Sequence, residues 1–228
     1  MVRRFVGKYR SWPLFVYGRS CSHSESSSRV WGRQYLRHAS SCKPDPCAIA
    51  IQGGFQWKRG GVMDPRQIML NRIDELVAKG DKMIINVWGS EDGLQNGFCY
   101  SVGLTSLGLP ELFISGNADP RIQCALIESV AAMYQEKGVS LGIHEGLLAN
   151  GLRMELVEVD CADHKIRNEY IILAMDYYQG HAIPGCIRLV QLRWPDTQGR
   201  LPDEPGYDMA DKQDLLPSSA QTKSMQFH

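Results

Sequence analysis

The sequence lacks long apolar runs and familiar catalytic signatures. No stretch approaches the roughly 18 apolar residues that a membrane-spanning helix needs, and the longest runs, such as Ile171–Met175, have the size of core segments. The GxSxG, GxGxxG and HExxH motifs and the phosphate-binding P-loop are also absent. We therefore expect no membrane helix, and motifs alone indicate no reaction class.

The cysteines give no sign of a disulfide framework or a metal site. Their number, seven, is odd, and no CxxC pair occurs. This pattern favours a reducing compartment and predicts a cytoplasmic protein. Cys161 and His164 are spaced C-x₂-H, but no second pair at ligand spacing accompanies them, so we predict no metal and no cofactor. Cys99 alternates with Phe98 and Tyr100, which predicts a packing role.

Acidic residues are scarce in the first part of the chain. Residues 1–62 hold eleven Lys/Arg against two Asp/Glu, a net +9, and residues 63–228 hold 14 against 23, a net −9. We predict a disordered basic leader over 1–62, a single domain over 63–208 and a flexible tail over 209–228. An organellar transit peptide and a basic arm for nucleic acid or anionic lipid stay open as alternatives for the leader, and nucleic acid is expected only there.

Hydrophobic periodicity predicts alternating helices and strands within residues 63–208. Aspartate–proline pairs mark two helix starts, since Pro65 follows Asp64 and Pro120 follows Asp119, with Asn117 an alternative cap. We expect helices over 64–80, 120–138 and 162–180, strands over 82–88, 98–104, 111–116, 152–160 and 186–194, and an irregular segment over 139–151. This order predicts an α+β fold of mixed α/β layers: one mixed, largely antiparallel sheet with about three helices.

The most distinctive segment, Trp194–Tyr207, reads WPDTQGRLPDEPGY. Pro195 ends the preceding strand, and Asp196 opens a predicted β-turn that closes at a glycine. Arg200 is expected to pair with Asp196, Glu204 or Asp92. The segment is either a rigid loop that closes the fold or a loop whose arginine binds a phosphate or carboxylate.

Glu111 is a second candidate, at the start of a predicted strand and close in sequence to Tyr100. A buried glutamate there would serve as a general base, cap a turn, or pair with Arg193 or Arg200. The polar turn Ser90–Gly93 lacks the spacing of a calcium loop and is expected to be solvated.

These motifs resemble the family called the domain of unknown function 4262, found in bacteria and phages. The similar residues are the strand Phe98–Leu104, the triplet Pro110–Leu112 and the closing segment from Trp194 to Tyr207. The resemblance spans about 72–208 and departs at Leu109, where many relatives have histidine. It implies one fold unit and no known reaction.

We expect three loops, Ser90–Gly97, Thr105–Pro110 and Trp194–Tyr207, to meet at one end of the sheet and to bind an unknown small molecule or protein partner. The alternative is a hydrolase or phosphate-handling enzyme with Glu111 or Asp196 as base and Arg200 as charge stabiliser. The candidate binding residues are Asp92, Tyr100, Glu111, Asp196, Arg200 and Tyr207.

Overall fold

The computed structural model describes residues 64–90, 95–116, 118–148, 151–181 and 187–219, together with the backbone of Leu14–Tyr17. Three helices of nine or more residues occur in this part: α2 (Pro65–Val77), α3 (Pro120–Lys137) and α4 (Ile172–Gly180). The strands are β1 (Leu14–Tyr17), β2 (Met83–Val87), β3 (Phe98–Val102), β4 (Glu111–Ser115), β5 (Gly142–Glu145), β6 (Arg153–Val159) and β7 (Leu189–Arg193).

All strands belong to one sheet with the order β1-β2-β3-β4-β7-β6-β5. Only β4 and β7 run parallel, and the other neighbours are antiparallel. The parallel pair needs a crossover, which the long segment from α3 to α4 supplies. The predicted fold class, α+β with one mixed and largely antiparallel sheet, is confirmed.

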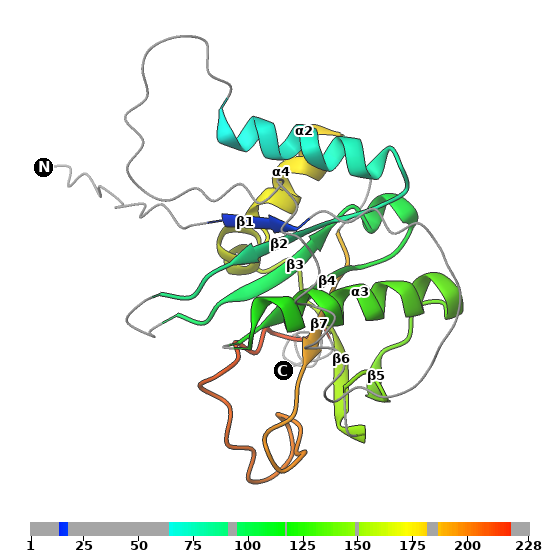
Figure 1. Cartoon of the computed structure of the whole chain (residues 1–228). Coiled ribbons are helices and arrows are strands. Elements are labelled where there is room, and N and C mark those ends of the chain that lie inside the picture. The colour runs from blue at the N-terminus through cyan, green and yellow to red at the C-terminus, as the bar shows by residue number, and fades with distance from the viewer. Residues whose placement is uncertain are drawn as a thin grey trace, which may run out of the picture.

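Helices cover both faces of the sheet (Figure 1). Helices α2 and α4 pack on one face, where alternate residues such as Met83 and Ile85 contribute to the core. Helix α3 packs on the other face against the intervening residues, including Ile84 and Cys99. The period of two along each strand therefore divides the core into two layers, and both faces of the central strands are buried.

The two predicted aspartate–proline helix starts are confirmed. Asp64 accepts a hydrogen bond from Arg66 N at 3.1 Å, and Asp119 accepts one from Arg121 N at 2.8 Å. The hydrophobic pattern of α3 predicts a buried stripe that begins at Ile122. That first position is wrong, because Ile122 is 54% exposed and Gln123 is buried instead.

The sequence missed one strand and one helix irregularity. Strand β5 forms within the segment expected to be irregular, at the edge of the sheet beside β6. The helix expected over 162–180 is interrupted, since a π-helical turn at Ile166–Tyr170 precedes α4.

The predicted leader and tail need partial correction. Strand β1, within the leader, pairs antiparallel with β2 at the edge of the sheet; the rest of 1–63 lies outside the described residues. The tail expected to be flexible from 209 packs on the sheet as far as 219. Leu216 is buried, and its N–H donates to Gln191 Oε1 at 2.9 Å. Buried polar groups of β7 therefore depend on this segment.

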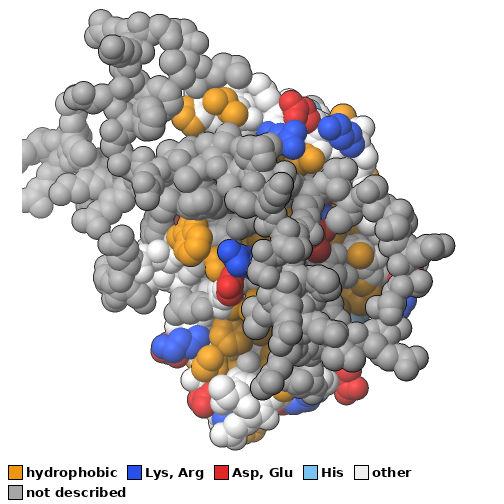
Figure 2. Space-filling model, viewed as in Figure 1, with side chains coloured by type: hydrophobic (Ala, Val, Ile, Leu, Met, Phe, Trp, Pro, Cys, Tyr) orange, Lys and Arg blue, Asp and Glu red, His pale blue; other side chains and the backbone are white. Residues whose placement is uncertain are grey.

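None of the described helices is long and apolar enough to cross a membrane. Lys/Arg and Asp/Glu side chains lie interspersed over the described surface in the view of Figure 2.

Candidate functional site

Glu111 lies at the start of β4 and is almost fully buried. Its Oε2 accepts a hydrogen bond from Ser101 Oγ at 2.5 Å, and its Oε1 accepts from the backbone N–H groups of Gly103 at 3.1 Å and Thr105 at 2.8 Å. The Tyr178 hydroxyl donates to the same oxygen. The carboxylate therefore joins β3, the following turn and α4.

Gly103 and Tyr178 complete this arrangement. Gly103 has φ +124°, a conformation that side chains disfavour, and its N–H also donates to the hydroxyl oxygen of Tyr178 at 2.7 Å. Burial and the neighbouring Glu111 raise the pKa of Tyr178, so its hydroxyl stays protonated and available as a donor. Of the roles expected for Glu111, this geometry matches the turn cap.

In the closing segment, Asp196 and Arg200 converge. Asp196 Oδ1 accepts from the N–H groups of Gln198 at 2.8 Å and Arg200 at 2.9 Å, and its Oδ2 accepts from Arg200 Nε at 2.6 Å. Burial opposes the charge on Asp196, but the bonds from Arg200 and Gln198 outweigh it and lower the pKa of the carboxyl. Of the described partners predicted for Arg200, Asp196 is the one it contacts, and Asp92 lies outside the described residues.

The rest of the closing segment is also held from within the fold. Glu204, another predicted partner of Arg200, pairs with Arg153 of β6 at 2.8 Å. The Tyr207 hydroxyl accepts from Gln213, whose side chain also donates to Trp194 O at 2.8 Å. Trp194 Nε1 donates to Ser115 O at 2.8 Å. The closing segment is thus bound by hydrogen bonds and an ion pair to β4, β6 and residues 209–219.

The candidate binding residues do not gather around one cavity. Tyr100 is buried in the core beneath α4, and burial raises the pKa of its hydroxyl. Glu111 contacts Tyr178 on that same side, whereas Asp196, Arg200 and Tyr207 belong to the closing segment. Asp92 lies outside the described residues. Their roles in binding stay predictions.

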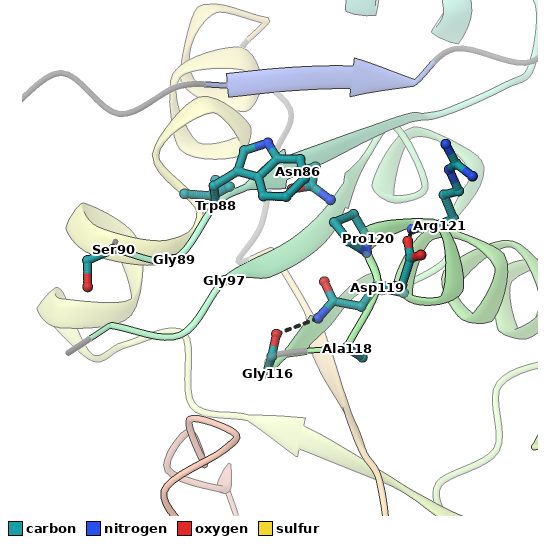
Figure 3. A pocket seen from close by; sticks show the side chains of 12 residues that line it. Asn86, Trp88, Gly89, Ser90, Gly97, Gly116, Ala118, Asp119, Pro120 and Arg121 are labelled. Carbon is teal, nitrogen blue, oxygen red and sulfur yellow. Dashed lines mark hydrogen bonds between the residues drawn. The ribbon is translucent and has the colours of Figure 1, made fainter. Parts of the chain in front are cut away.

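A separate hollow of about 670 Å³ opens between the end of β2, the start of β3 and the beginning of α3. Figure 3 shows Trp88 on one side of it and Asp119 and Pro120 on the other. Its lining mixes an indole, a guanidinium, amides and glycine backbone, from Asn86, Val87, Trp88, Gly89, Ser90, Gly97, Gly116, Ala118, Asp119, Pro120, Arg121 and Gln123. None of the five described candidate residues belongs to it.

The glycines allow the walls of this hollow to approach closely. A Cβ on Gly89 would lie 2.5 Å from Gln95 O, and one on Gly116 would lie 2.6 Å from the Trp194 ring. Trp88 is 42% exposed, and exposed Arg121 forms no ion pair within the described ranges. Trp88 and Arg121 therefore both belong to the lining of this hollow.

Two buried amides separate the hollow from a pair of thiols. Asn86 Nδ2 donates to Cys99 Sγ at 3.0 Å, and Cys99 Sγ lies 3.2 Å from Gln123 Oε1. Gln123 Nε2 donates to Gly116 O at 2.8 Å, as drawn in Figure 3. Cys124 of α3 is partly buried against the same core cluster as Cys99. Sequence reasoning missed this cluster because its members come from three separate elements.

No group of three or more His, Cys, Asp or Glu side chains among the described residues has the arrangement of a metal site. The described cysteines Cys99, Cys124 and Cys161 form no disulfide. Chemistry at the hollow thus rests on the groups of its lining: an indole, amides, a guanidinium, the Ser90 hydroxyl and the Asp119 carboxylate.

The fold and these contacts define a single α+β unit closed by a Pro/Gly-rich segment. The sequence profile of the family described as domain of unknown function DUF4262 matches residues 76–208. The chain belongs to this family. The matched range begins within α2 and ends just after Tyr207, so it includes both the Glu111 cluster and the closing segment. No curated protein matches the chain, and no solved structure does.

Proposed function

We propose that the chain is a small-ligand-binding module and that the hollow beside α3 is its binding site. The observation that carries the proposal is the lining, in which a partly exposed indole and a guanidinium without an ion pair among the described residues accompany two buried amides. Ligand sites are concave and combine apolar surface with a few polar groups. The Glu111 and Asp196 carboxylates already accept hydrogen bonds from the protein's own donors. The hollow is therefore a better candidate for the binding site than either carboxylate.

The lining indicates the chemical class of the ligand. Trp88 offers a flat face for stacking on an aromatic or heteroaromatic ring. Arg121 offers a fork of donors for a carboxylate or phosphate. The first turn of α3 adds little anion binding, because Asp119 already accepts from Arg121 N. We therefore propose a planar ring that carries one anionic group.

The test compares binding of two probes, benzoate and benzyl alcohol, by saturation-transfer NMR. Benzoate should bind the full chain more strongly, and Arg121→Gln should remove that preference. Arg72→Gln is the matched control, because Arg72 is also exposed on a helix and pairs with Glu75 at 2.5 Å, outside the lining. Trp88→Ala should weaken both probes. Equal binding by the wild-type chain and Arg121→Gln would contradict the proposal.

A hydrolase or phosphate-handling enzyme is the second candidate, and the convergence of Asp196 and Arg200 favours it. Arg200 Nη2 reaches only exposed Asp208, at 3.8 Å, so part of its guanidinium can meet a ligand. The Asp196 side chain, however, is fully enclosed, and a base needs access to its substrate. Phosphatase activity that is lost in Arg200→Lys would favour this candidate.

We also propose a cytoplasmic location. Cys99 and Cys124, which form no disulfide, support it, because cysteines outside disulfides persist most readily in a reducing compartment.

A further inference from the structure

Residues 213–218, here called the docked segment, follow the matched family range and lie against the sheet without forming a helix or a strand. Burial alternates along this segment, since Leu216 and Ser218 are buried whereas Leu215 and Pro217 are exposed. A period of two is typical of an extended chain that turns one face to a surface. The docked segment therefore has the shape in which folded domains often bind peptides.

Side chains of the two parallel strands, β4 and β7, bind the backbone of the docked segment. Ser115 Oγ, at the end of β4, accepts a hydrogen bond from Asp214 N at 2.8 Å and donates to Asp214 O at 3.0 Å. Gln191 of β7 donates to the same carbonyl oxygen at 2.5 Å and accepts from Leu216 N at 2.9 Å. Arg193 Nη2, also of β7, donates to Leu216 O at 3.0 Å. The N–H and C=O groups of two alternate residues are thus bound by side chains of the sheet.

Two side chains of the docked segment are also held by the domain. The Asp214 carboxylate accepts hydrogen bonds from Asn96 Nδ2 at 3.0 Å and from the Tyr170 hydroxyl at 3.2 Å. Leu216 is 5% exposed and belongs to the core layer that α2 and α4 cover. In peptide recognition of this kind, main-chain hydrogen bonds give affinity and contacts with alternate side chains give specificity. The surface therefore selects an aspartate followed two residues later by a leucine.

The surface beneath the docked segment is polar, which allows the segment to leave while the domain stays folded. Ser115, Gln191 and Arg193 are buried in the intact chain, and water can take over their hydrogen bonds when the segment leaves. An apolar surface would gain no such replacement on exposure. Detachment of the segment should therefore require less free energy than unfolding of the whole domain.

We propose that the docked segment is an internal ligand of a peptide-binding surface, and that this surface binds an extended Asp-x-Leu segment of a partner protein when the internal one detaches. The surface consists of Asn96, Ser115, Tyr170, Gln191 and Arg193, which all lie within the matched family range, whereas the docked segment lies beyond it. A tethered ligand has an effective concentration in the millimolar range, so it competes with every partner. The proposal does not depend on the ligand proposed for the hollow.

Hydrogen exchange of the full wild-type chain, followed by NMR, tests whether the docked segment detaches locally. The amides of Asp214 and Leu216 should exchange at least about tenfold faster than the amide of Glu111, which donates to Arg188 O between β4 and β7 at 2.9 Å. Local opening explains this difference, because it leaves the sheet intact. Equal rates that rise together with urea would overturn the proposal, since the segment would then leave only when the domain unfolds.

Binding of a separate peptide is measured by fluorescence polarisation with labelled DKQDLLPSS, the sequence of residues 211–219. The full chain with Asp214→Ala and Leu216→Ala should bind it at least about tenfold more tightly than the wild-type chain, whose internal ligand competes. Leu215→Ala is the matched control, because Leu215 is exposed, and it should bind like the wild type. Circular dichroism checks each fold, and Asp214→Ala alone replaces the double variant if that variant unfolds.

Two further comparisons place the peptide on this surface. A peptide with alanine at the positions of Asp214 and Leu216 should bind the double variant at least about tenfold more weakly than the original peptide. Asn96→Asp, added to the double variant, should weaken binding of the original peptide, because a carboxylate would replace the amide that donates to the aspartate. Equal binding of the two peptides, or no binding by the folded double variant, would overturn the proposal.

Discussion

Replacing Glu111 by glutamine tests whether its buried carboxylate stabilises the turn between β3 and β4. Glutamine preserves the shape and one acceptor oxygen, which can still receive the N–H groups of Gly103 and Thr105. Its amide nitrogen would then face the Ser101 hydroxyl, which at present donates to Glu111. The Ser101 hydroxyl already accepts a hydrogen bond from Leu112 N at 2.8 Å. In the glutamine variant it must also accept one from the new amide, and its own hydrogen no longer has an acceptor.

The expected cost follows from these changes. Hydrogen bonds to a charged acceptor contribute about 1.5–3 kcal/mol and neutral ones about 1 kcal/mol, so losing the charge and one well-made bond should cost about 2–3 kcal/mol. Glu111→Ala removes the acceptor of Ser101, Thr105 and Tyr178 at once. Burying donors without partners should raise the loss to about 4 kcal/mol, even if water enters the space.

Urea unfolding followed by far-ultraviolet circular dichroism measures these free energies. Glu75→Gln is the matched control, because Glu75 is 60% exposed and its pair with Arg72 should contribute less than about 1 kcal/mol. If Glu111→Gln and Glu75→Gln unfold at the same urea concentration, the buried carboxylate contributes nothing to the fold. The general-base role expected for Glu111 would then be the better explanation of its burial.

Two further substitutions test the closing segment. Gly116→Ala should destabilise the protein by more than about 3 kcal/mol, because the new Cβ would lie 2.6 Å from the Trp194 ring and Gly116 has φ +129°. Gly108→Ala is the control in the same urea assay. It should cost about 1 kcal/mol, because a Cβ on Gly108 would meet nothing within 4 Å. The pKa of Asp196 is lowered in the folded chain, so the folded chain binds this proton less tightly than the unfolded chain does. The ionised Asp196 therefore stabilises the fold fully above about pH 4, near its unfolded pKa. This stabilisation is lost as the pH falls through the pKa of Asp196 in the folded chain. Asp196→Asn should flatten this acid part of the stability curve, and an unchanged slope would contradict the assignment.

Local chemistry made much of the fold predictable. The aspartate–proline pairs at Asp64 and Asp119 mark helix starts that need no tertiary information. Strand β5 was not predictable in this way, because its four residues, Gly142–Glu145, have little β propensity of their own. Pairing with β6 stabilises it, and a single sequence does not reveal that contact.

The candidate site was predictable only in part, and for the same reason. The Asp196–Arg200 pair lies four residues apart within one turn, so its spacing was enough to find it. The hollow combines the ends of β2 and β3 with the start of α3, and the sequence gives no sign that these meet. Residues 209–219 were expected to be flexible because they are polar; their polar groups instead serve buried partners such as Gln191 and Ser115.

The polar groups around Cys99 are difficult to explain by stability alone. Sulfur is a weak hydrogen-bond acceptor, so the bond from Asn86 to Cys99 Sγ offsets little of the free-energy cost of burying the amide. Valine suits a β-strand, and Asn86→Val should therefore change the free energy of unfolding by less than about 1 kcal/mol. If Asn86→Val instead destabilises the protein by more than about 2 kcal/mol in the urea assay, the amide is needed for the fold and this reasoning is wrong.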